Sequence, residues 1–340
     1  MKMKISGLLM LFGLVIVLAA CGEKTQEDVV ADLKETVEKM DGYRAKAEMN
    51  MNTGQEQQTF QINIWHKKDD MYRVGLSNKS DEKGNQIILK NDDGVFVLTP
   101  ALNKSFKFQS EWPQNSSQPY LYQSLIQDIE KDKEAEFEVT DSHYVFKTKT
   151  NYQSNNNLPY QEIYLDKKSL HPTQVKVLDK DKNALVDVSF SSFDSKASFK
   201  DDDFSMKKNM GSEESEEAEE TAAITEEQEA LTVFYPSYMA GAELTEKKET
   251  STETGDRVIL TFEGEKNFTL VEEKAQIRTT MATPNEVEGE IVNLGFAVGA
   301  ITDNSIEWTH NGVDFMLASE ELTKEELIEV AKSVQRKEVK

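Results

Sequence analysis

The chain has 340 residues, of which 62 are acidic and 39 are basic, so its formal net charge is −23. A surface this acidic argues against nucleic acid as a partner and against docking on anionic lipid by charge. Charged residues make up 30% and hydrophobic residues 38%, which is typical of a globular protein long enough for two domains. The single cysteine excludes an intrachain disulfide.

The N-terminal 21 residues have the form of a secretory signal. Two lysines precede an apolar run over residues 5–18, which leads into Ala19, Ala20 and Cys21. An apolar stretch of about 14 residues before small residues indicates a signal peptide, because a membrane span needs about 20. Leu-Ala-Ala-Cys resembles the lipobox of bacterial lipoproteins. The resemblance implies removal of residues 1–20, lipidation of Cys21 and anchoring on the extracytoplasmic face of the cell membrane. The alternative is a buried N-terminal helix with an incidental cysteine.

The next part of the chain predicts one helix and then many short strands. Apolar residues recur at helical spacing over residues 26–40, and Asp41-Gly42 is expected to end that helix. Apolar and polar residues then alternate, which is typical of strands with one buried face. A second helix is predicted at residues 120–131. The predicted strands cover residues 43–51, 60–64, 70–77, 85–90, 94–99, 104–109, 135–140, 143–149, 160–165, 172–179 and 183–191. About eleven antiparallel strands with two helices predict a mainly β fold, a curved sheet or open half-barrel under a helical lid.

An acidic segment divides the chain. Residues 211–230 contain nine glutamates and a single large apolar residue, Ile224. Such a segment buries too little surface to offset its ordering entropy, and its like charges repel. We expect an extended linker at residues 207–230 between domains at 21–206 and 231–340. A solvated acidic helix over part of it is the alternative, and a calcium loop is disfavoured because no glycine follows Gly211.

The C-terminal part predicts a small α+β domain. Asn311-Gly312 lies between two strand-like runs, which indicates a two-residue hairpin turn. Thr323 and Glu326 have the spacing of a capping box. The helix that follows is expected to bury Leu327, Ile328, Ala331 and Val334.

Several ordered segments resemble the LolA/LolB-like lipoprotein-carrier family. They are WHKKDDMYRV at residues 65–74, IILKNDDGVFVLTPALNKSFKF at residues 87–108, and the hairpins from residue 163 to residue 204. The segment from residue 306 onward is similar to the end of a DUF4367-type extracytoplasmic domain. The two resemblances behind a lipobox are similar to the sporulation lipoproteins of endospore-forming Gram-positive bacteria.

The carrier family implies an apolar interior that holds acyl chains beneath the lid. An arginine that reaches the lid from the barrel is also implied, and Arg73 matches it. An exposed position on a strand face is an equally good interpretation of Arg73. The apolar side chains either line a groove or fill a core, as alternating apolar residues usually do. The cavity candidates are Met49, Met51, Phe60, Ile62, Ile64, Val97, Tyr122 and Leu125.

The sequence contains no recognisable catalytic constellation. The four histidines are far apart in the chain without metal-ligand spacing, and there is no phosphate-binding or nucleophile-elbow motif. We therefore expect no enzyme activity, no cofactor and no metal. The expected function is a membrane-anchored binding or scaffold protein with an unidentified envelope protein partner, linked to sporulation or germination. One alternative is a sensor that binds a lipid or lipoprotein and signals through an anti-sigma factor, and another is an envelope enzyme acting on peptidoglycan.

Overall fold

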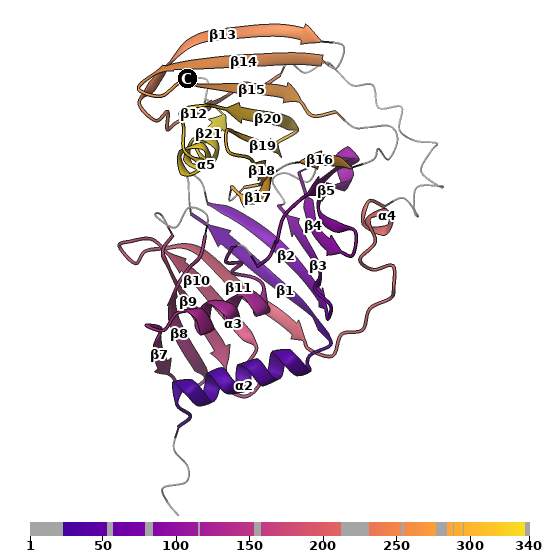
Figure 1. Ribbon diagram of the computed structural model, residues 1–340, viewed down its shortest axis with the longest axis vertical. Helices are drawn as coiled ribbons and strands as arrows, with labels where there is room; N and C mark the ends of the chain where they lie inside the picture. Colours follow the sequence, from indigo (N-terminus) through magenta and orange to yellow (C-terminus); the bar gives the residue numbers. More distant parts are fainter. Residues whose placement is uncertain are drawn as a thin grey trace, which may run out of the picture.

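The computed structural model describes residues 23–336 apart from residues 53–56, 79–83, 115, 153–157, 212–230, 253–254, 277–283, 288 and 295. Cys21 and most of the predicted linker lie outside the described residues. Figure 1 shows two sheets following one another along the long axis, with helices α2 and α3 beside the first and α5 beside the second. Within the described residues, no helix is both long enough and apolar enough to cross a membrane.

The first sheet contains all eleven strands predicted from the sequence. In chain order they are β1 (Gly42–Met51), β2 (Gln58–Lys67), β3 (Met71–Ser77), β4 (Gln86–Asn91), β5 (Gly94–Thr99), β6 (Lys104–Phe108), β7 (Glu136–Val139), β8 (His143–Lys149), β9 (Tyr160–Asp166), β10 (Pro172–Leu178) and β11 (Ala184–Asp194). These strands are antiparallel to their neighbours, and β1 pairs with both β2 and β11. A twelfth strand, β16 (Asn285–Val287), adds to the far edge, beside β6. The predicted curved, open antiparallel sheet is confirmed.

Helices α2 (Gln26–Lys39) and α3 (Tyr122–Lys131) pack on one face of this sheet. Helix α2 begins at a capping box between Thr25 and Asp28, in which each side chain satisfies a free backbone N–H group. Helix α3 is held at its N-terminus by Tyr43, whose hydroxyl accepts a hydrogen bond from the Tyr122 backbone N–H at 3.2 Å. Because Tyr43 is fully buried, this bond fixes the lid to the sheet from inside the core.

The opposite face of the first sheet is covered by the chain itself. Residues 199–211, which we call the strap, include the short helix α4 (Met206–Asn209). Phe204 and Met210 of the strap pack with Leu89 and Phe96 of the sheet in a second apolar cluster. The predicted linker begins at residue 207, but Asn209 and Met210 within it are buried against the first sheet.

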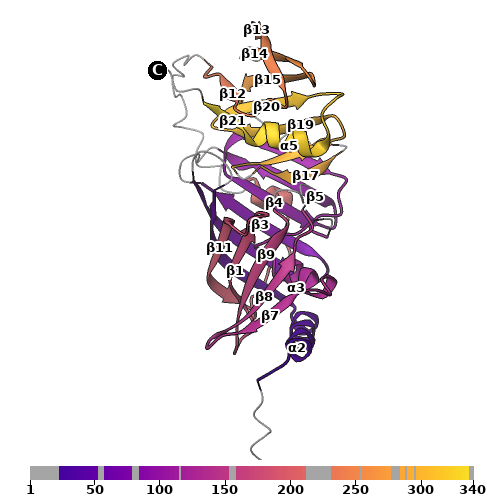
Figure 2. The ribbon, with the colours of Figure 1, turned by 90° about the vertical axis from the view of Figure 1, so that its left-hand side faces the viewer.

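The second sheet has seven strands in the order β13-β14-β15-β20-β19-β18-β17. Helix α5 (Lys324–Lys332) covers one of its faces, as Figure 2 shows from the side. A separate two-stranded sheet joins β12 (Phe234–Pro236) to β21 (Val334–Arg336). The strands of the large sheet are β13 (Ala242–Thr252), β14 (Gly255–Gly264), β15 (Phe268–Lys274), β17 (Glu290–Asn293), β18 (Val298–Ile301), β19 (Ser305–His310) and β20 (Val313–Ala318).

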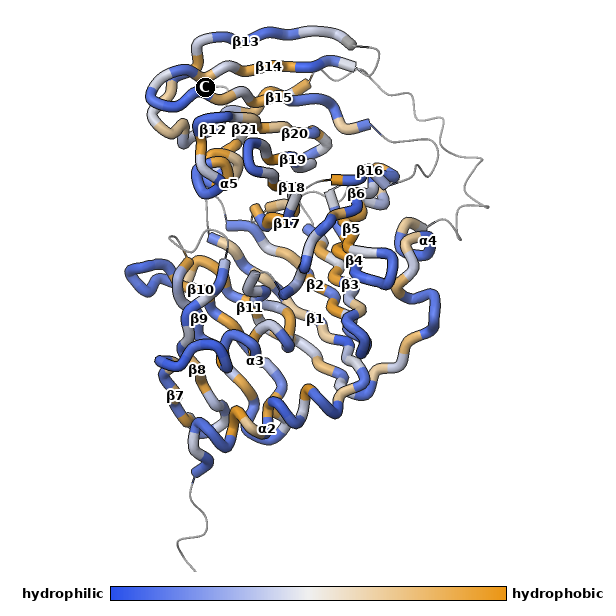
Figure 3. The backbone as a smooth tube through the Cα atoms, in the orientation of Figure 1, coloured by the Kyte–Doolittle hydropathy of each residue, from blue (hydrophilic) through white to orange (hydrophobic). Residues whose placement is uncertain are grey.

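Two local predictions for the C-terminal part are confirmed, and one is wrong. Asn311 and Gly312 have φ values of 49° and 72°, as a hairpin turn of this kind requires. Thr323 and Glu326 form the predicted capping box. Val334 is buried but belongs to β21 rather than to the helix, because the helix ends at Lys332 and the chain turns to pair with β12. Figure 3 shows hydrophobic colouring recurring along the strands of both sheets and mainly hydrophilic colouring on β13 at the free edge.

Candidate functional site

The predicted cavity residues are all buried in the core of the first domain. Their exposed fractions lie between 0% and 6%. Met49, Met51, Phe60, Ile62, Ile64, Val97, Tyr122 and Leu125 belong to one apolar cluster. Met49 and Met51 line a cavity of about 70 Å³, and Phe60 lines one of about 10 Å³. Ile62, Ile64, Tyr122 and Leu125 line neither of these cavities. Within the part of the chain that the structure describes, these side chains pack on one another in one buried apolar cluster beneath the lid.

The second domain packs over the end of the first where this cavity lies. Ile291 and Val298 belong to the core of the first domain, and both line the cavity of about 70 Å³. The Gln86 side chain fixes this contact. Its amide donates to the Val298 carbonyl at 2.9 Å and accepts from the Val298 N–H at 2.7 Å. The buried Gln86 side chain thus makes the two backbone hydrogen bonds that a neighbouring strand would make with Val298. Both polar groups of the Gln86 amide have a hydrogen-bond partner.

Two polar groups lie at the wall of the same cavity. The indole Nε1–H of Trp112 is buried and has no hydrogen-bond acceptor among the described residues. Lys332, at the end of α5, also lines the cavity, and burial lowers the pKa of its ammonium group. A buried donor without an acceptor costs free energy, so this cavity is the part of the interior best suited to a small polar group.

The prediction that Arg73 contacts the lid is wrong. Tyr72 and Val74 are buried beneath the lid, so strand alternation directs Arg73 to the opposite face. There its guanidinium lies over the Trp65 ring, 4.5 Å from the centroid, and its Nε–H donates to Asn209 Oδ1 of the strap. Burial lowers the pKa of Arg73. The arginine holds the strap, not α3, against the sheet.

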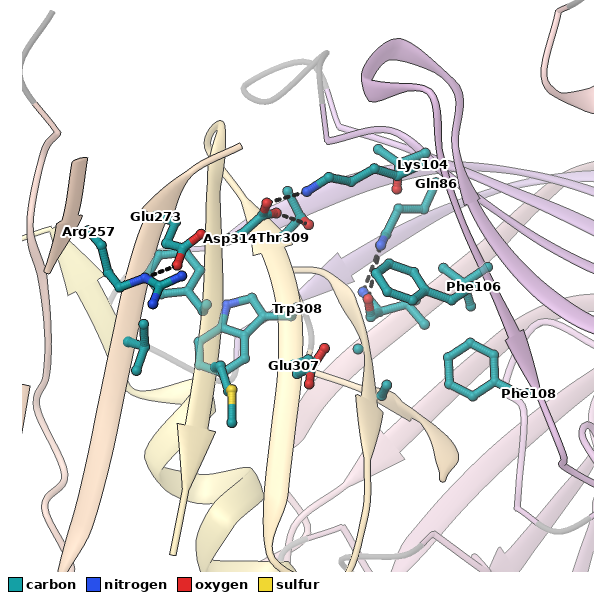
Figure 4. A pocket seen from close by; sticks show the side chains of 18 residues that line it. Gln86, Lys104, Phe106, Phe108, Arg257, Glu273, Glu307, Trp308, Thr309 and Asp314 are labelled. Atoms are coloured by element: carbon teal, nitrogen blue, oxygen red, sulfur yellow. Dashed lines mark hydrogen bonds and ion pairs between the residues drawn. The ribbon is translucent and has the colours of Figure 1, made fainter. Parts of the chain in front are cut away.

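A cleft of about 380 Å³ lies at the inter-domain contact. Figure 4 shows its walls, which come from both domains. Phe106 and Phe108 of β6 contribute from the first sheet, and Glu307 and Met316 from the second. This volume lies in the range of small-molecule sites.

Charged side chains in the cleft form two ion pairs. Lys104 of β6 pairs with Asp314 of β20 across the domain boundary, and Thr309 donates to the same carboxylate at 2.6 Å. Arg257 pairs with Glu273 on the second sheet. Glu307 forms no ion pair among the described residues. Glu307 is exposed at the cleft, but the protein atoms around its carboxyl displace some water and, with Asp314 nearby, raise its pKa. One carboxylate therefore remains uncompensated at the cleft.

The described residues contain no group of three or more His, Cys, Asp or Glu side chains positioned to hold a metal ion. His66 is buried between Tyr43 and Tyr72, and its Nδ1–H donates to the Met71 carbonyl at 3.2 Å. Burial lowers the pKa of His66 to about 4, which keeps the ring neutral. His66 is therefore a core residue.

Sequence reasoning missed the inter-domain residues. Gln86, Lys104 and Asp314 occupy positions in alternating strands that look like ordinary polar residues. Their partners lie about 210 positions away in the chain, and nothing local marks such pairs. Only the structure shows that Lys104 is 8% exposed and therefore needs a counter-charge.

Comparison with known proteins gives one family and several solved folds. Residues 1–204 match the family model described as sporulation protein YdcC-like. Sporulation protein YdcC of Bacillus subtilis (strain 168) is 47% identical over 337 residues, which cover 98% of each chain.

Among solved structures, the complex of MucA and MucB from Pseudomonas aeruginosa aligns at 14% identity over 91% of this chain and 99% of the matched chain, with a TM-score of 0.31. The LolA superfamily protein NE2245 from Nitrosomonas europaea aligns at 9% identity over 54% of this chain and 98% of that protein, with a TM-score of 0.30. No functional argument rests on likenesses this distant. The predicted relationship to sporulation proteins is confirmed by the sequence matches, and the chain belongs to the YdcC-like sporulation protein family.

Proposed function

We propose that this protein is a non-enzymatic binding protein of sporulation, anchored on the extracytoplasmic face of the cell membrane by a lipid at Cys21. The observation that carries this proposal is the packed interior of the first domain. A packed interior leaves little room for a ligand, so binding has to take place elsewhere on the molecule. The cavity at the end of this interior, where the second domain packs, is about 70 Å³, well below the roughly 300 Å³ at which small-molecule sites begin. Outer surfaces and the inter-domain cleft then supply the binding.

Family membership supports the link to sporulation. The test is replacement of the 47% identical relative in Bacillus subtilis by this chain. We expect heat-resistant spore yield and germination to be restored relative to a deletion strain. Failure of the expressed, folded chain to restore either property would contradict the proposed role.

The anchor has its own test. The N-terminal run that ends in Leu18-Ala19-Ala20-Cys21 supports lipidation, because its length and flanks are those of a signal rather than a span. Cys21→Ala should abolish labelling by a clickable fatty acid, and the protein should be released from membranes or retained as uncleaved precursor. Normal labelling of that variant would overturn the anchor.

The second candidate is a lipid-binding sensor, which the unpaired Trp112 N–H group at the interior cavity favours. Methionines at the cavity wall adapt to different shapes, so an acyl chain would have to displace Met49 and Met51. A fluorescent fatty acid is the probe. Binding at micromolar affinity that is lost in Trp112→Phe would favour the sensor over the scaffold.

A further inference from the structure

Among the described helices, only α5 packs on the second sheet, and it covers one of the two faces. Helix α5 packs on the side of Leu270, Phe315 and Leu317, so alternation places their neighbours on the opposite side. On that opposite side, Ile259 pairs across strands with Val271, Val271 with Met316, and Met316 with Glu307. We call these four residues the open-face row.

The open-face row is an apolar strip that ends in a carboxylate. Ile259 and Val271 are half-buried. Met316 is 42% exposed, one of three large hydrophobic side chains exposed to this degree among the described residues, all of them in the second domain. Cross-strand neighbours of this kind form one continuous surface. An apolar strip on the surface of a charged protein is typical of an interaction site.

Met316 separates two hollows on this face. On one side lies the inter-domain cleft of about 380 Å³. On the other lies a hollow of about 490 Å³, lined by Thr261, Thr269, Ala318 and Ser305 among others. Small-molecule sites enclose most of their ligand, whereas this surface is open and extends over four strands. Its shape fits a protein segment.

The charges determine what kind of segment fits. Both cations of the cleft, Lys104 and Arg257, are already paired, whereas Glu307 has no ion-pair partner among the described residues. A second copy of the chain is disfavoured, because two chains with a formal charge of −23 repel each other. A partner side chain beside Met316 would also lie beside Glu307, since the two residues face each other across β19 and β20.

We propose that the open-face row docks a basic protein segment in which an apolar side chain lies next to a lysine or arginine. The apolar side chain packs on Val271 and Met316, and the cation pairs with Glu307. Because Glu307 is exposed, this pairing orients and selects the partner more than it adds affinity. This inference rests on the proposed binding role and names the surface and the partner class.

The test uses the full-length chain in sporulating Bacillus subtilis that lacks its own relative. Photoreactive p-benzoylphenylalanine replaces Met316, and the cross-linked partner peptides are sequenced. We expect cross-links to protein segments with Lys or Arg within a few residues of the attachment point. Glu307→Lys should reduce their yield at least tenfold, because it places a like charge against the partner.

Two matched controls test whether the effect belongs to this surface or to the overall negative charge of the protein. Glu243→Lys changes an exposed carboxylate on β13 and should leave the yield within twofold. The same probe at Leu244, which is 41% exposed on that strand, should give no cross-link that depends on Glu307. Thermal unfolding of each variant checks that the fold is intact.

Three outcomes would overturn the inference: no protein cross-link at position 316, cross-links to segments without basic residues, or equal yields in the Glu307→Lys and Glu243→Lys variants. In each case spore yield is measured in the same cells. Normal spore yield would leave the proposed function intact while this surface is rejected. Loss of spore function in the unsubstituted chain would reject the proposed function itself.

Discussion

Ile64 is enclosed by its own sheet and by the lid. It pairs with Ala45 and Val74 across the neighbouring strands and is fully buried. Ile64→Ala should therefore leave a void and lower the free energy of unfolding by roughly 2–5 kcal/mol. Urea-induced unfolding measures this change.

Ile259 provides the matched control, because it is a strand isoleucine that remains half-exposed on the second sheet. Ile259→Ala should lower the free energy of unfolding by no more than about 1 kcal/mol. Similar small losses in the two variants, together with fatty-acid binding by the wild-type protein, would show an open groove around Ile64 instead of a closed core.

Two buried titratable side chains should give opposite pH dependences. Burial lowers the pKa of His66 to about 4 from an unfolded value of 6.5. Its contribution to stability is therefore present above pH 6.5 and is lost as the pH falls towards 4. Burial raises the pKa of Glu272 to about 7 from 4.5, so its contribution is present below pH 4.5 and is lost as the pH rises through 7. Since one pKa unit corresponds to about 1.36 kcal/mol, each effect amounts to roughly 3 kcal/mol.

The two variants that test this are His66→Gln and Glu272→Gln. Against wild type, His66→Gln should remove the stabilisation that the first sheet gains between pH 4 and 6.5. Glu272→Gln should make the second sheet more stable above pH 7, because its amide can still accept the Phe234 N–H bond that Glu272 accepts at 3.0 Å. Hydrogen exchange of strand amides reports each sheet separately. If the dependence of stability on pH in either variant runs parallel to that of the wild type, burial does not shift the pKa of that residue as described.

Among the elements, the strap is held by polar contacts from three strands: Arg73 to Asn209, Asn91 to the Phe204 carbonyl at 2.9 Å, and Arg44 to Asp203 at 3.6 Å. Asn209 accepts from the Arg73 Nε–H group and donates to the carbonyls of Asp203 and Ser205. Asn209→Ala would leave a largely buried guanidinium without this acceptor, and hydrogen bonds to charged groups are worth roughly 1.5–3 kcal/mol. We expect faster hydrogen exchange over residues 199–211 and a stability loss of that order.

Asp201→Ala, at an exposed position in the same strap, is the control for this prediction. It should change neither exchange nor stability measurably. Unchanged exchange in Asn209→Ala would mean that the apolar packing of Phe204 and Met210 and the contacts from Asn91 and Arg44 hold the strap without Arg73.

Local sequence patterns were sufficient to predict most elements. All eleven strands of the first domain and both of its long helices were predicted, because alternation and helical spacing each report a buried face. At Gly42, the structural reason for a glycine differs from the one that the sequence suggested. It does not end the helix but lies in β1, where a Cβ atom would approach the His66 carbonyl oxygen to 2.5 Å. Strand alternation alone places Arg73 opposite the lid, yet the family resemblance outweighed that pattern.

The arrangement of the whole molecule was not predictable from local pattern. Strand β16 has three residues and pairs in parallel with β6, which lies far earlier in the chain. Gln86 and Val298 exchange two hydrogen bonds across 212 positions. Such contacts depend on how two finished surfaces meet, and a single sequence carries no periodic signal for them. The inter-domain cleft arises from this meeting, so the sequence could predict the core but not the candidate site.

Limited proteolysis tests the coupling of the two domains. We expect the first cut in the acidic segment at residues 212–230, because like charges and little apolar surface disfavour packing there. The two fragments should nevertheless stay together on a sizing column, since Gln86, the Lys104–Asp314 pair and β16 all join the domains.

Gln86→Leu removes both hydrogen bonds to Val298 and leaves a buried N–H and a buried carbonyl unpaired, which costs roughly 1–3 kcal/mol for each group. The fragments of this variant should therefore separate at concentrations where wild-type fragments remain bound. Gln61→Leu, at an exposed site on β2, should behave like wild type. If wild-type fragments separate as readily as those of Gln86→Leu, the domains are linked only by the chain, and a cleft formed by residues of both cannot persist in solution.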